Sequence, residues 1–262
     1  MKILKDKVNV CIITGYGINS DYESEYAFKL AGAENVQRIH VNLLLKGNEK
    51  LQNYDIIMFP GGFSFGDNLG SGRVLANKFR FGLREQLTEF IDSGGLIFGV
   101  CNGFQILVKM GLLPALNNNY YVQTVSLIGN KSGKFEMRWV KLKIIESSKC
   151  IWTKNIGDVL ELPVRHGEGQ FVIKDELILK ELWNRNLVVM TYEPNKYPNN
   201  PNGSINGIAG ICNESGRIFG LMPHPECHVH LYQYPLWTRG STPKVNGLKI
   251  FENAVNFVRE NF

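Results

Sequence analysis

The sequence predicts an α/β fold with a mostly parallel central sheet to which antiparallel strands are added. Two patterns carry this prediction. Through the first half of the chain, short apolar, β-branched runs alternate with helical patterns, as expected for a parallel sheet flanked by helices. In the second half, short strand-like segments follow one another with few helical patterns between them, which favours antiparallel pairing.

Seven elements are predicted in the first half. The continuously apolar run Ile-Ile-Met-Phe at 56–59 is typical of a strand buried on both faces. Glycines close the first two helical patterns, at Gly32 and at Gly94. The predicted strands are 8–14, 36–41, 55–59 and 96–100, and the predicted helices are 22–33, 74–93 and 103–110.

The second half contains six further predicted strands and one helix. The strands are 135–145, 159–164, 171–174, 188–192, 208–212 and 218–222. The segment 195–206, rich in asparagine and proline, is predicted as a loop, and the proline-containing segment 223–243 as surface chain. A final helix at 248–259 carries its apolar residues on one face. No repeat or linker divides the chain, so we expect one domain, residues 1–262, with an extended loop at about 227–247.

Composition excludes several classes of protein. With 44% hydrophobic and 20% charged residues, the chain is typical of a globular protein and not of a disordered one. The net charge of +5 is mild and the basic residues are scattered, so neither nucleic acid nor a membrane surface is a predicted partner. No apolar run approaches the roughly 18 to 20 residues that span a bilayer. Five cysteines without a Cys-x-x-Cys pair indicate a reducing compartment, and we expect a cytoplasmic location.

The motif Gly-Val-Cys-Asn-Gly at 99–103 is the sharpest chemical signal. It follows a predicted buried strand and opens a helix, the arrangement of a nucleophile elbow with cysteine in place of serine. Its glycines allow the sharp turn that presents the sulfur, and a helix N-terminus favours a thiolate. Cys101 is therefore the candidate nucleophile. A buried core cysteine beside a glycine turn is the plainer alternative.

A cysteine nucleophile needs a base and a group that orients the base. Two His-x-Glu pairs qualify, His224 with Glu226 and His166 with Glu168. Residues two apart in an extended chain project to the same side, so either glutamate could hold its imidazole. His224 is favoured because it follows a predicted buried strand, at the end where active sites of parallel sheets collect. His166 lies in a predicted glycine-flanked turn.

A glycine-rich loop follows the third predicted strand and begins with Pro-Gly-Gly-Phe at 60–63. Backbone N–H groups of this loop, together with that of Asn102, would form an oxyanion hole. The loop lacks the Gly-Lys-[Ser/Thr] ending of a P-loop, so phosphate binding is not predicted. A loop that only turns the chain is the alternative.

A short cluster of potential metal ligands contains His224, Cys227, His228 and His230. Such density could indicate zinc, but no second ligand pair with suitable spacing occurs elsewhere in the sequence. A metal on His224 would also deprive Cys101 of its base. We therefore predict no metal site.

Taken together, these motifs resemble class I, triad-type glutamine amidotransferases, and most closely the glutaminase subunits of phosphoribosylformylglycinamidine synthase. The matching segments run in family order over nearly the whole chain: 60–67, 99–105, 132–136, 166–169, 199–207 and 223–226. The Cys-Asn-Gly-Phe-Gln and Gly-Gly-Phe-Ser-Phe-Gly-Asp motifs are specific to this subfamily, whereas Gly-x-Cys-x-Gly marks only the superfamily. The resemblance implies a three-layer, flavodoxin-like glutamine amidotransferase fold.

The resemblance also implies a mechanism. Cys101 is the implied nucleophile, His224 the general base and acid, and Glu226 the residue that orients His224. The thiolate attacks the glutamine side-chain amide, ammonia leaves, and water releases glutamate from the thioester. In the family this ammonia passes to a larger synthetase subunit of an ATP-dependent ligase in de novo purine synthesis.

Further roles follow from the same resemblance. Gly62 or Phe63, together with Asn102, would supply the oxyanion-hole amides, and Gln105 would help to hold the glutamine substrate. His166 matches a family segment without an implied role. ATP and magnesium are expected on the synthetase partner and no cofactor on this chain, and a small third subunit often joins the complex.

Two other functions remain open on the sequence. A cysteine hydrolase or peptidase of the same superfold would use the same elbow on other substrates. A non-catalytic interaction protein could keep the fold, although the presence of all three triad residues disfavours it. The segment 227–247 is longer than expected for a compact stand-alone subunit, which leaves the partner surface open.

Overall fold

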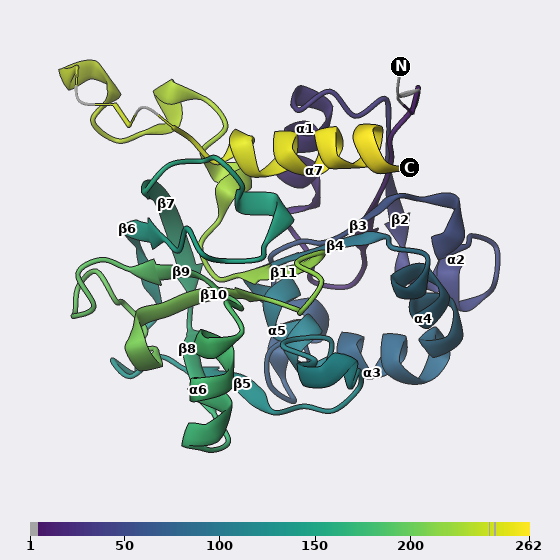
Figure 1. Ribbon diagram of the computed structural model, residues 1–262, viewed down its shortest axis with the longest axis horizontal. Helices are drawn as coiled ribbons and strands as arrows, with labels where there is room; N and C mark the ends of the chain where they lie inside the picture. The colour runs from purple at the N-terminus through teal and green to yellow at the C-terminus, as the bar shows by residue number, and fades with distance from the viewer. Residues whose placement is uncertain (1–4, 241, 244) are drawn as a thin grey trace.

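A computed structural model describes residues 5–240, 242–243 and 245–262. Its centre is a nine-stranded sheet in the order β2-β1-β3-β4-β11-β10-β9-β6-β7 (Figure 1). The first five of these strands are parallel to one another: β2 (Asn35–His40), β1 (Asn9–Thr14), β3 (Ile56–Phe59), β4 (Leu96–Val100) and β11 (Ile218–Leu221). All residues of β3, β4 and β11 are buried, as their apolar runs predict.

The other half of the sheet is antiparallel. It consists of β10 (Ile208–Cys212), β9 (Val188–Tyr192), β6 (Glu136–Ile144) and β7 (Val159–His166). A separate antiparallel pair joins β5 (Val125–Gly129) to β8 (Glu168–Ile173). The predicted α/β fold with a mainly parallel sheet and added antiparallel strands is confirmed.

Helices cover both faces of the sheet and complete three layers (Figure 1). On one face lie α1 (Asp21–Leu30) and α7 (Leu248–Asn261), and on the other α3 (Arg73–Gly82) and α5 (Asn102–Met110). The predicted apolar face of α7 is buried against this sheet, and Phe251 packs on Phe28 of α1 with ring centroids 4.9 Å apart. The short α2 (Val41–Leu45) and α4 (Arg84–Asp92) lie beside the β2 edge of the sheet (Figure 1).

The predicted long helix 74–93 is wrong, because the structure divides it into α3 and α4. Leu83 leaves the helical region, with φ −130° and ψ 15°, and its side chain is buried. The break follows Gly82, where a Cβ would lie 2.6 Å from Leu45 of α2. The side chain of Leu45 thus packs directly against the backbone at the point where the helix ends.

Three elements were not predicted: α2, β5 and α6 (Glu176–Asn184). Only Ile178 and Leu182 of α6 are buried, so its helical periodicity is weak. A capping signal was nonetheless present, since the Asp175 carboxylate accepts the N–H groups of Leu177 and Ile178.

The segment predicted as surface chain, 223–243, is buried at its start. His224, Glu226 and His228 are all at most 2% exposed, because the N–H of His224 donates to Pro163 and the Nδ1 of His228 donates to the Glu161 carbonyl, both on β7. Only the part near 231–240 projects, at the upper left of Figure 1, with Trp237 half exposed. Positions 241 and 244 of the expected extended loop lie outside the described residues.

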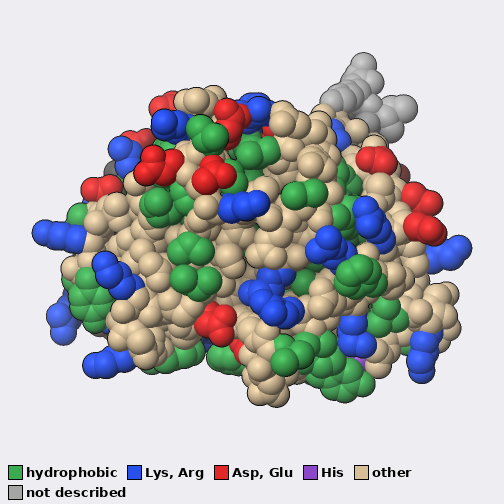
Figure 2. Space-filling view, turned by 90° about the horizontal axis from the view of Figure 1, so that it is seen from below, with side chains coloured by type: hydrophobic (Ala, Val, Ile, Leu, Met, Phe, Trp, Pro, Cys, Tyr) green, Lys and Arg blue, Asp and Glu red, His purple; other side chains and the backbone are tan. Residues whose placement is uncertain are grey.

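The surface carries no single field of charge on the face drawn in Figure 2, where basic, acidic and apolar side chains are interspersed. Of the helices that the structure describes, none has the length and apolar character needed to cross a bilayer. The topology instead brings several loops together at one edge of the sheet. The carboxyl ends of β3, β4, β11, β9 and β7 meet there, and the site described next lies at this edge.

Candidate active site

Cys101 occupies a strained turn between β4 and α5. Its backbone has φ 52° and ψ −107°, a conformation that costs a non-glycine residue of the order of 1–3 kcal/mol. Two contacts hold it there, since its N–H donates to Leu221 on β11 at 2.8 Å and its carbonyl accepts the N–H of Gln105 at 3.1 Å. A Cβ at Gly103 would lie 1.8 Å from the Phe59 carbonyl oxygen, so the glycine allows the helix to start against β3. The structure therefore has the elbow geometry that the motif predicts.

His224 and Glu226 form a buried pair just beyond the carboxyl end of β11. Nδ1 of His224 donates to Oε1 of Glu226 at 2.6 Å, and the two residues are 2% and 1% exposed. This bond leaves the Nε2 of His224 without a protein partner among the described residues. Burial opposes a charge on the ring, but the Glu226 carboxylate and the Cys101 sulfur outweigh it and hold the pKa of His224 well above its usual value. The protonated ring can donate a proton to a leaving group.

His166, the alternative base, has a different environment. It ends β7 instead of lying in a turn, and its Nδ1 is 3.1 Å from the Asn130 side-chain oxygen. Asn130 uses its NH2 group on two carbonyls, so its oxygen accepts from His166 and from Gly169. Burial and the charge of His224 lower the pKa of His166 to about 4. The alternative His166–Glu168 pair is not formed, because the Glu168 carboxylate accepts the Ser71 N–H instead.

The oxyanion loop is held by the segment after β1. Asn19 and Ser20 both donate their N–H groups to the carbonyl of Gly61, and Phe63 donates its own to Gly17 at 2.7 Å. The N–H of Phe63 is therefore already used within the protein, and its role as an oxyanion amide stays a prediction. Gly62, with φ 148°, has no protein acceptor for its N–H within the described chain. Gly62 and Asn102 are thus the predicted amides that remain available.

A closed ring of side-chain and backbone hydrogen bonds holds the oxyanion loop in place. The Asn102 side chain accepts the N–H of Ser64 at 3.2 Å and donates to Gln105 at 2.9 Å and Asp67 at 3.3 Å. Gln105 donates to the Glu168 carbonyl, the Glu168 carboxylate accepts the N–H of Ser71, and the Ser71 hydroxyl returns to Asp67. The ring ties the nucleophile helix to the oxyanion loop and to β8.

Gln105 forms its hydrogen bonds within the protein. Its side chain is 3% exposed, both atoms of its amide have protein partners, and it does not line the cavity beside Cys101. In this structure it positions Asn102. Its role in holding substrate stays a prediction.

A cavity of about 180 Å³ opens beside the nucleophile. The lining residues come from six parts of the chain: Asn19, Ser20, Gly62, Phe63, Cys101, Phe135, Met137, Arg165 and His224. Sequence reasoning missed the wall formed by Asn19 and Ser20 and the wall formed by β6 and β7. No local motif marks either wall, because each is a polar turn or a strand surface like many others.

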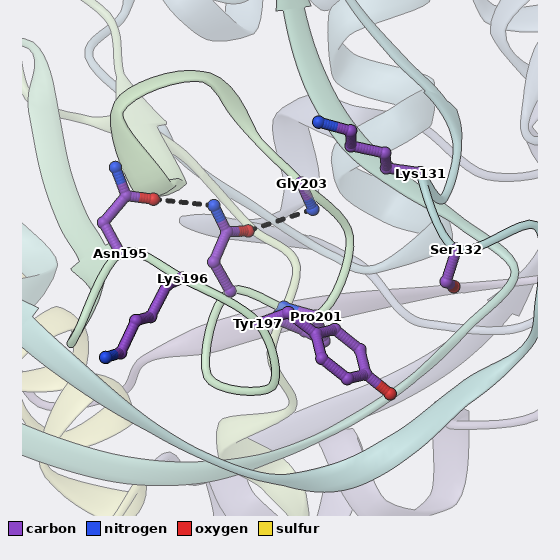
Figure 3. A pocket seen from close by; sticks show the side chains of 8 residues that line it. Lys131, Ser132, Asn195, Lys196, Tyr197, Pro201 and Gly203 are labelled. Carbon is purple, nitrogen blue, oxygen red and sulfur yellow. Dashed lines mark hydrogen bonds between the residues drawn. The ribbon is translucent and has the colours of Figure 1, made fainter.

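A larger cavity of about 500 Å³ lies between the loops 131–132 and 195–203 (Figure 3). Asn200 accepts the N–H of Gly203 and donates to Asn195, and these two hydrogen bonds hold the loop 195–203 together. None of the predicted catalytic residues lines it. The nucleophile places the chemistry in the smaller cavity.

The four potential zinc ligands do not come together in the described structure. His228 donates its Nδ1 to a carbonyl, and the Nε2 of His230 is 2.8 Å from the Tyr26 hydroxyl. His224, Glu226 and Cys227 do have ligand atoms within 4.8 Å of one another. The Arg165 guanidinium, however, donates to Cys227 at 3.0 Å and opposes a cation there.

Comparisons with known proteins agree with the geometry. The family model of the CobB/CobQ-like glutamine amidotransferase domain matches residues 7–258. The PurQ subunit of phosphoribosylformylglycinamidine synthase from Dehalococcoides mccartyi is 46% identical over 259 residues, which cover 97% of this chain and 99% of that protein. The subunit of the same name from Methanococcus maripaludis is 42% identical, with coverage of 97% and 99%.

Solved structures give the same result. A chain in the structure of PurLQS from Thermotoga maritima superposes with a TM-score of 0.73 at 33% identity, and covers 96% of this chain and 99% of its own length. A glutamine amidotransferase from the same organism shares the fold at 18% identity, with a TM-score of 0.57 and coverage of 98% and 100%. The resemblance inferred from the motifs and the predicted function in purine biosynthesis are confirmed. The chain belongs to the PurQ family, the glutamine amidotransferase subunits of phosphoribosylformylglycinamidine synthase.

Proposed function

We propose that this chain hydrolyses glutamine to glutamate and ammonia through a thioester on Cys101. The observation that carries the proposal is the elbow conformation of Cys101, at φ 52° and ψ −107°, on the same cavity as the His224–Glu226 pair. A strained turn of this kind is retained where it presents a nucleophile. The proposal assigns His224 as base and acid, and Glu226 as the residue that orients it.

The proposed steps use the free atoms of the site. The Cys101 sulfur attacks the side-chain amide carbon of glutamine, and the oxyanion accepts hydrogen bonds from the amides of Gly62 and Asn102. The imidazolium of His224 donates its Nε2 proton to the departing ammonia, and the neutral ring then takes a proton from water. The resulting hydroxide attacks the thioester, glutamate leaves, and the thiolate and imidazolium return.

We further propose that the ammonia passes to a synthetase subunit, where ATP and magnesium would act, in the cytoplasm. Support comes from the PurLQS complex in which the Thermotoga maritima relative occurs. On this proposal the whole chain acts as one amidotransferase domain without a cofactor of its own, and a small third subunit would join the complex. The segment 227–247 would be an enlarged loop of that domain.

The test is glutamine hydrolysis by the full chain together with the proteins that co-purify with it. Cys101→Ala should lose at least about 10³-fold in kcat, whereas Cys150→Ala, which removes a buried thiol outside the cavity, should change it little. A glutamine-analogue electrophile should label Cys101, and glutamine should protect it. Retained turnover in Cys101→Ala would overturn the thioester mechanism. Absence of a synthetase among the co-purifying proteins would overturn the proposed partner.

A further inference from the structure

The cavity beside Cys101 contains one fixed positive charge. Most of its lining side chains are neutral, and the charge of His224 is balanced by Glu226. Arg165 is the exception among the lining residues that the structure describes. It faces Met137 across the β6–β7 pair, and both residues contribute to the same wall.

The guanidinium of Arg165 forms few hydrogen bonds within the described part of the protein. Its one hydrogen bond in the described chain goes to the sulfur of Cys227, at 3.0 Å. Burial and the Glu226 charge raise the pKa of Cys227, so this sulfur is a neutral thiol and a weak acceptor. No carboxylate in the described part of the chain forms an ion pair with Arg165. Guanidinium offers five N–H donors, so most of them remain available to a ligand.

The position of Arg165 allows its guanidinium to contact the end of the substrate that does not react. Its backbone oxygen lies 3.8 Å from the Cys101 sulfur, and its guanidinium lies 3.0 Å from the sulfur of Cys227, so the residue reaches from the reacting atom toward the segment after β11. Glutamine bound with its side-chain amide at Cys101 must hold its α-carboxylate several bonds away from that sulfur. A planar guanidinium recognises a carboxylate with two parallel hydrogen bonds.

We infer that Arg165 binds the α-carboxylate of glutamine and so makes the site specific for the free amino acid. The inference rests on the proposed glutaminase function and adds a recognition residue to it. Because the carboxylate does not react, this contact stabilises the bound substrate and the transition state alike. Its loss should therefore appear in KM and leave kcat nearly unchanged.

The experiment compares two substrates in the full chain with its co-purifying partners. One is L-glutamine, and the other is its α-amide, glutaminamide, which has the same reacting group but no carboxylate. Arg165→Met should raise the KM for glutamine about 10- to 100-fold, as expected for loss of a charged hydrogen bond, with kcat within about threefold. The same variant should leave kcat/KM for glutaminamide within about threefold of the wild type. The KM of Arg165→Lys for glutamine should lie between those of the wild type and Arg165→Met, because lysine keeps the positive charge but cannot form the two parallel hydrogen bonds of a guanidinium.

Arg138→Met is the matched control. Arg138 lies on the neighbouring strand β6, pairs with Glu136 and does not line the cavity, so its loss should leave the preference for glutamine intact. Equal losses on both substrates in Arg165→Met would mean a structural role and overturn the inference. If Arg165→Met fails to fold, the kcat/KM values of the wild type for the two substrates are the test. Equal kcat/KM values for glutamine and glutaminamide in the wild type would also overturn the inference. Turnover of glutamine by Cys101→Ala would instead refute the glutaminase proposal itself.

Discussion

The parallel and antiparallel halves of the sheet contribute to the site in different ways. In the parallel half, backbone conformation does the positioning: Cys101 has a positive φ, Gly62 has φ 148°, and Gly103 packs on the carbonyl of Phe59. In the antiparallel half, side chains on β6 and β7 form the wall, with Arg165 as the charged member. Strained backbone admits few residue types and is visible in sequence as glycine motifs. A strand surface admits many residue types, so no sequence motif marks it.

The two halves are joined at the active site. The N–H of His224, which follows the parallel strand β11, donates to the carbonyl of Pro163 on β7. The position of the base therefore depends on the antiparallel half although its motif follows a parallel strand. Gln105, on the nucleophile helix, donates to the carbonyl of Glu168 on β8, which belongs to the separate β5–β8 pair. Variants that separate backbone effects from side-chain effects test this division of roles.

The largest effect is expected from Gly103→Ala. The added Cβ would lie 1.8 Å from the Phe59 carbonyl oxygen, so either β3 or the start of α5 must move, and the elbow with it. We expect no soluble folded protein, or a loss of at least about 10³-fold in kcat. Gly129→Ala, on β5, is the control, since its Cβ would meet nothing within 4 Å. Wild-type glutaminase rates in Gly103→Ala would show that the backbone of the parallel half is not the determinant.

Glu226→Gln should have the next largest effect. The carboxylate helps to keep the pKa of His224 well above its usual value, and without it burial lowers that pKa. We expect kcat to fall about 10²- to 10³-fold and the alkaline limb of the kcat/KM profile to move to lower pH. The measurement is a pH–rate profile of both proteins. An alkaline limb at the same pH in the variant would contradict the assignment of His224 as the acid.

The lowered pKa of His166 should make the stability of the protein depend on pH. Burial, with the charge of His224, lowers its pKa from 6.5 to about 4, so above pH 6.5 the ring is neutral in both the native and the unfolded protein. Between pH 6.5 and 4 the unfolded chain binds a proton that the native protein does not. The free energy of unfolding should therefore fall by up to about 3 kcal/mol over this range on account of His166.

Denaturant unfolding at pH 7.5, 5.5 and 4.5 measures this effect in the wild type and in His166→Gln. The variant should lose stability at pH 7.5 but show the smaller decline toward acid. His230→Gln, which removes an imidazole near the surface, is the comparison. Parallel declines in His166→Gln and the wild type would refute the neutral, buried assignment of His166.

The smallest effect is expected from Asp67→Asn. The change replaces the acceptor of the Asn102 amide and weakens the ring that holds Ser64 and the oxyanion loop. We expect kcat to fall about tenfold with little change in KM, because the oxyanion forms only during the reaction. Asp158→Asn, an exposed site on another loop, should behave as the wild type. A change confined to KM would mean that the ring shapes the substrate cavity and not the oxyanion hole.

The parallel half of the sheet and the nucleophile can be predicted from local sequence patterns. Buried strands such as 56–59 need continuous apolar runs, and an elbow needs glycines at set distances from its cysteine, so both are local patterns. The position of His224 after a buried strand favours it over His166, and in the structure His224 is paired with its glutamate whereas His166 lies beside Asn130. These patterns did not predict the break at Leu83, the elements α2, β5 and α6, or the burial of the start of the segment 223–243.

Which polar groups are free to act depends on contacts between segments that are distant in sequence. The N–H of Phe63 is taken by Gly17 and the amide of Gln105 by Asn102 and Glu168, whereas the guanidinium of Arg165 keeps open donors beside Cys101. The physical reason is the same in each case. A polar group is available for substrate only if no other part of the chain satisfies it, and its partners here lie in segments distant in sequence.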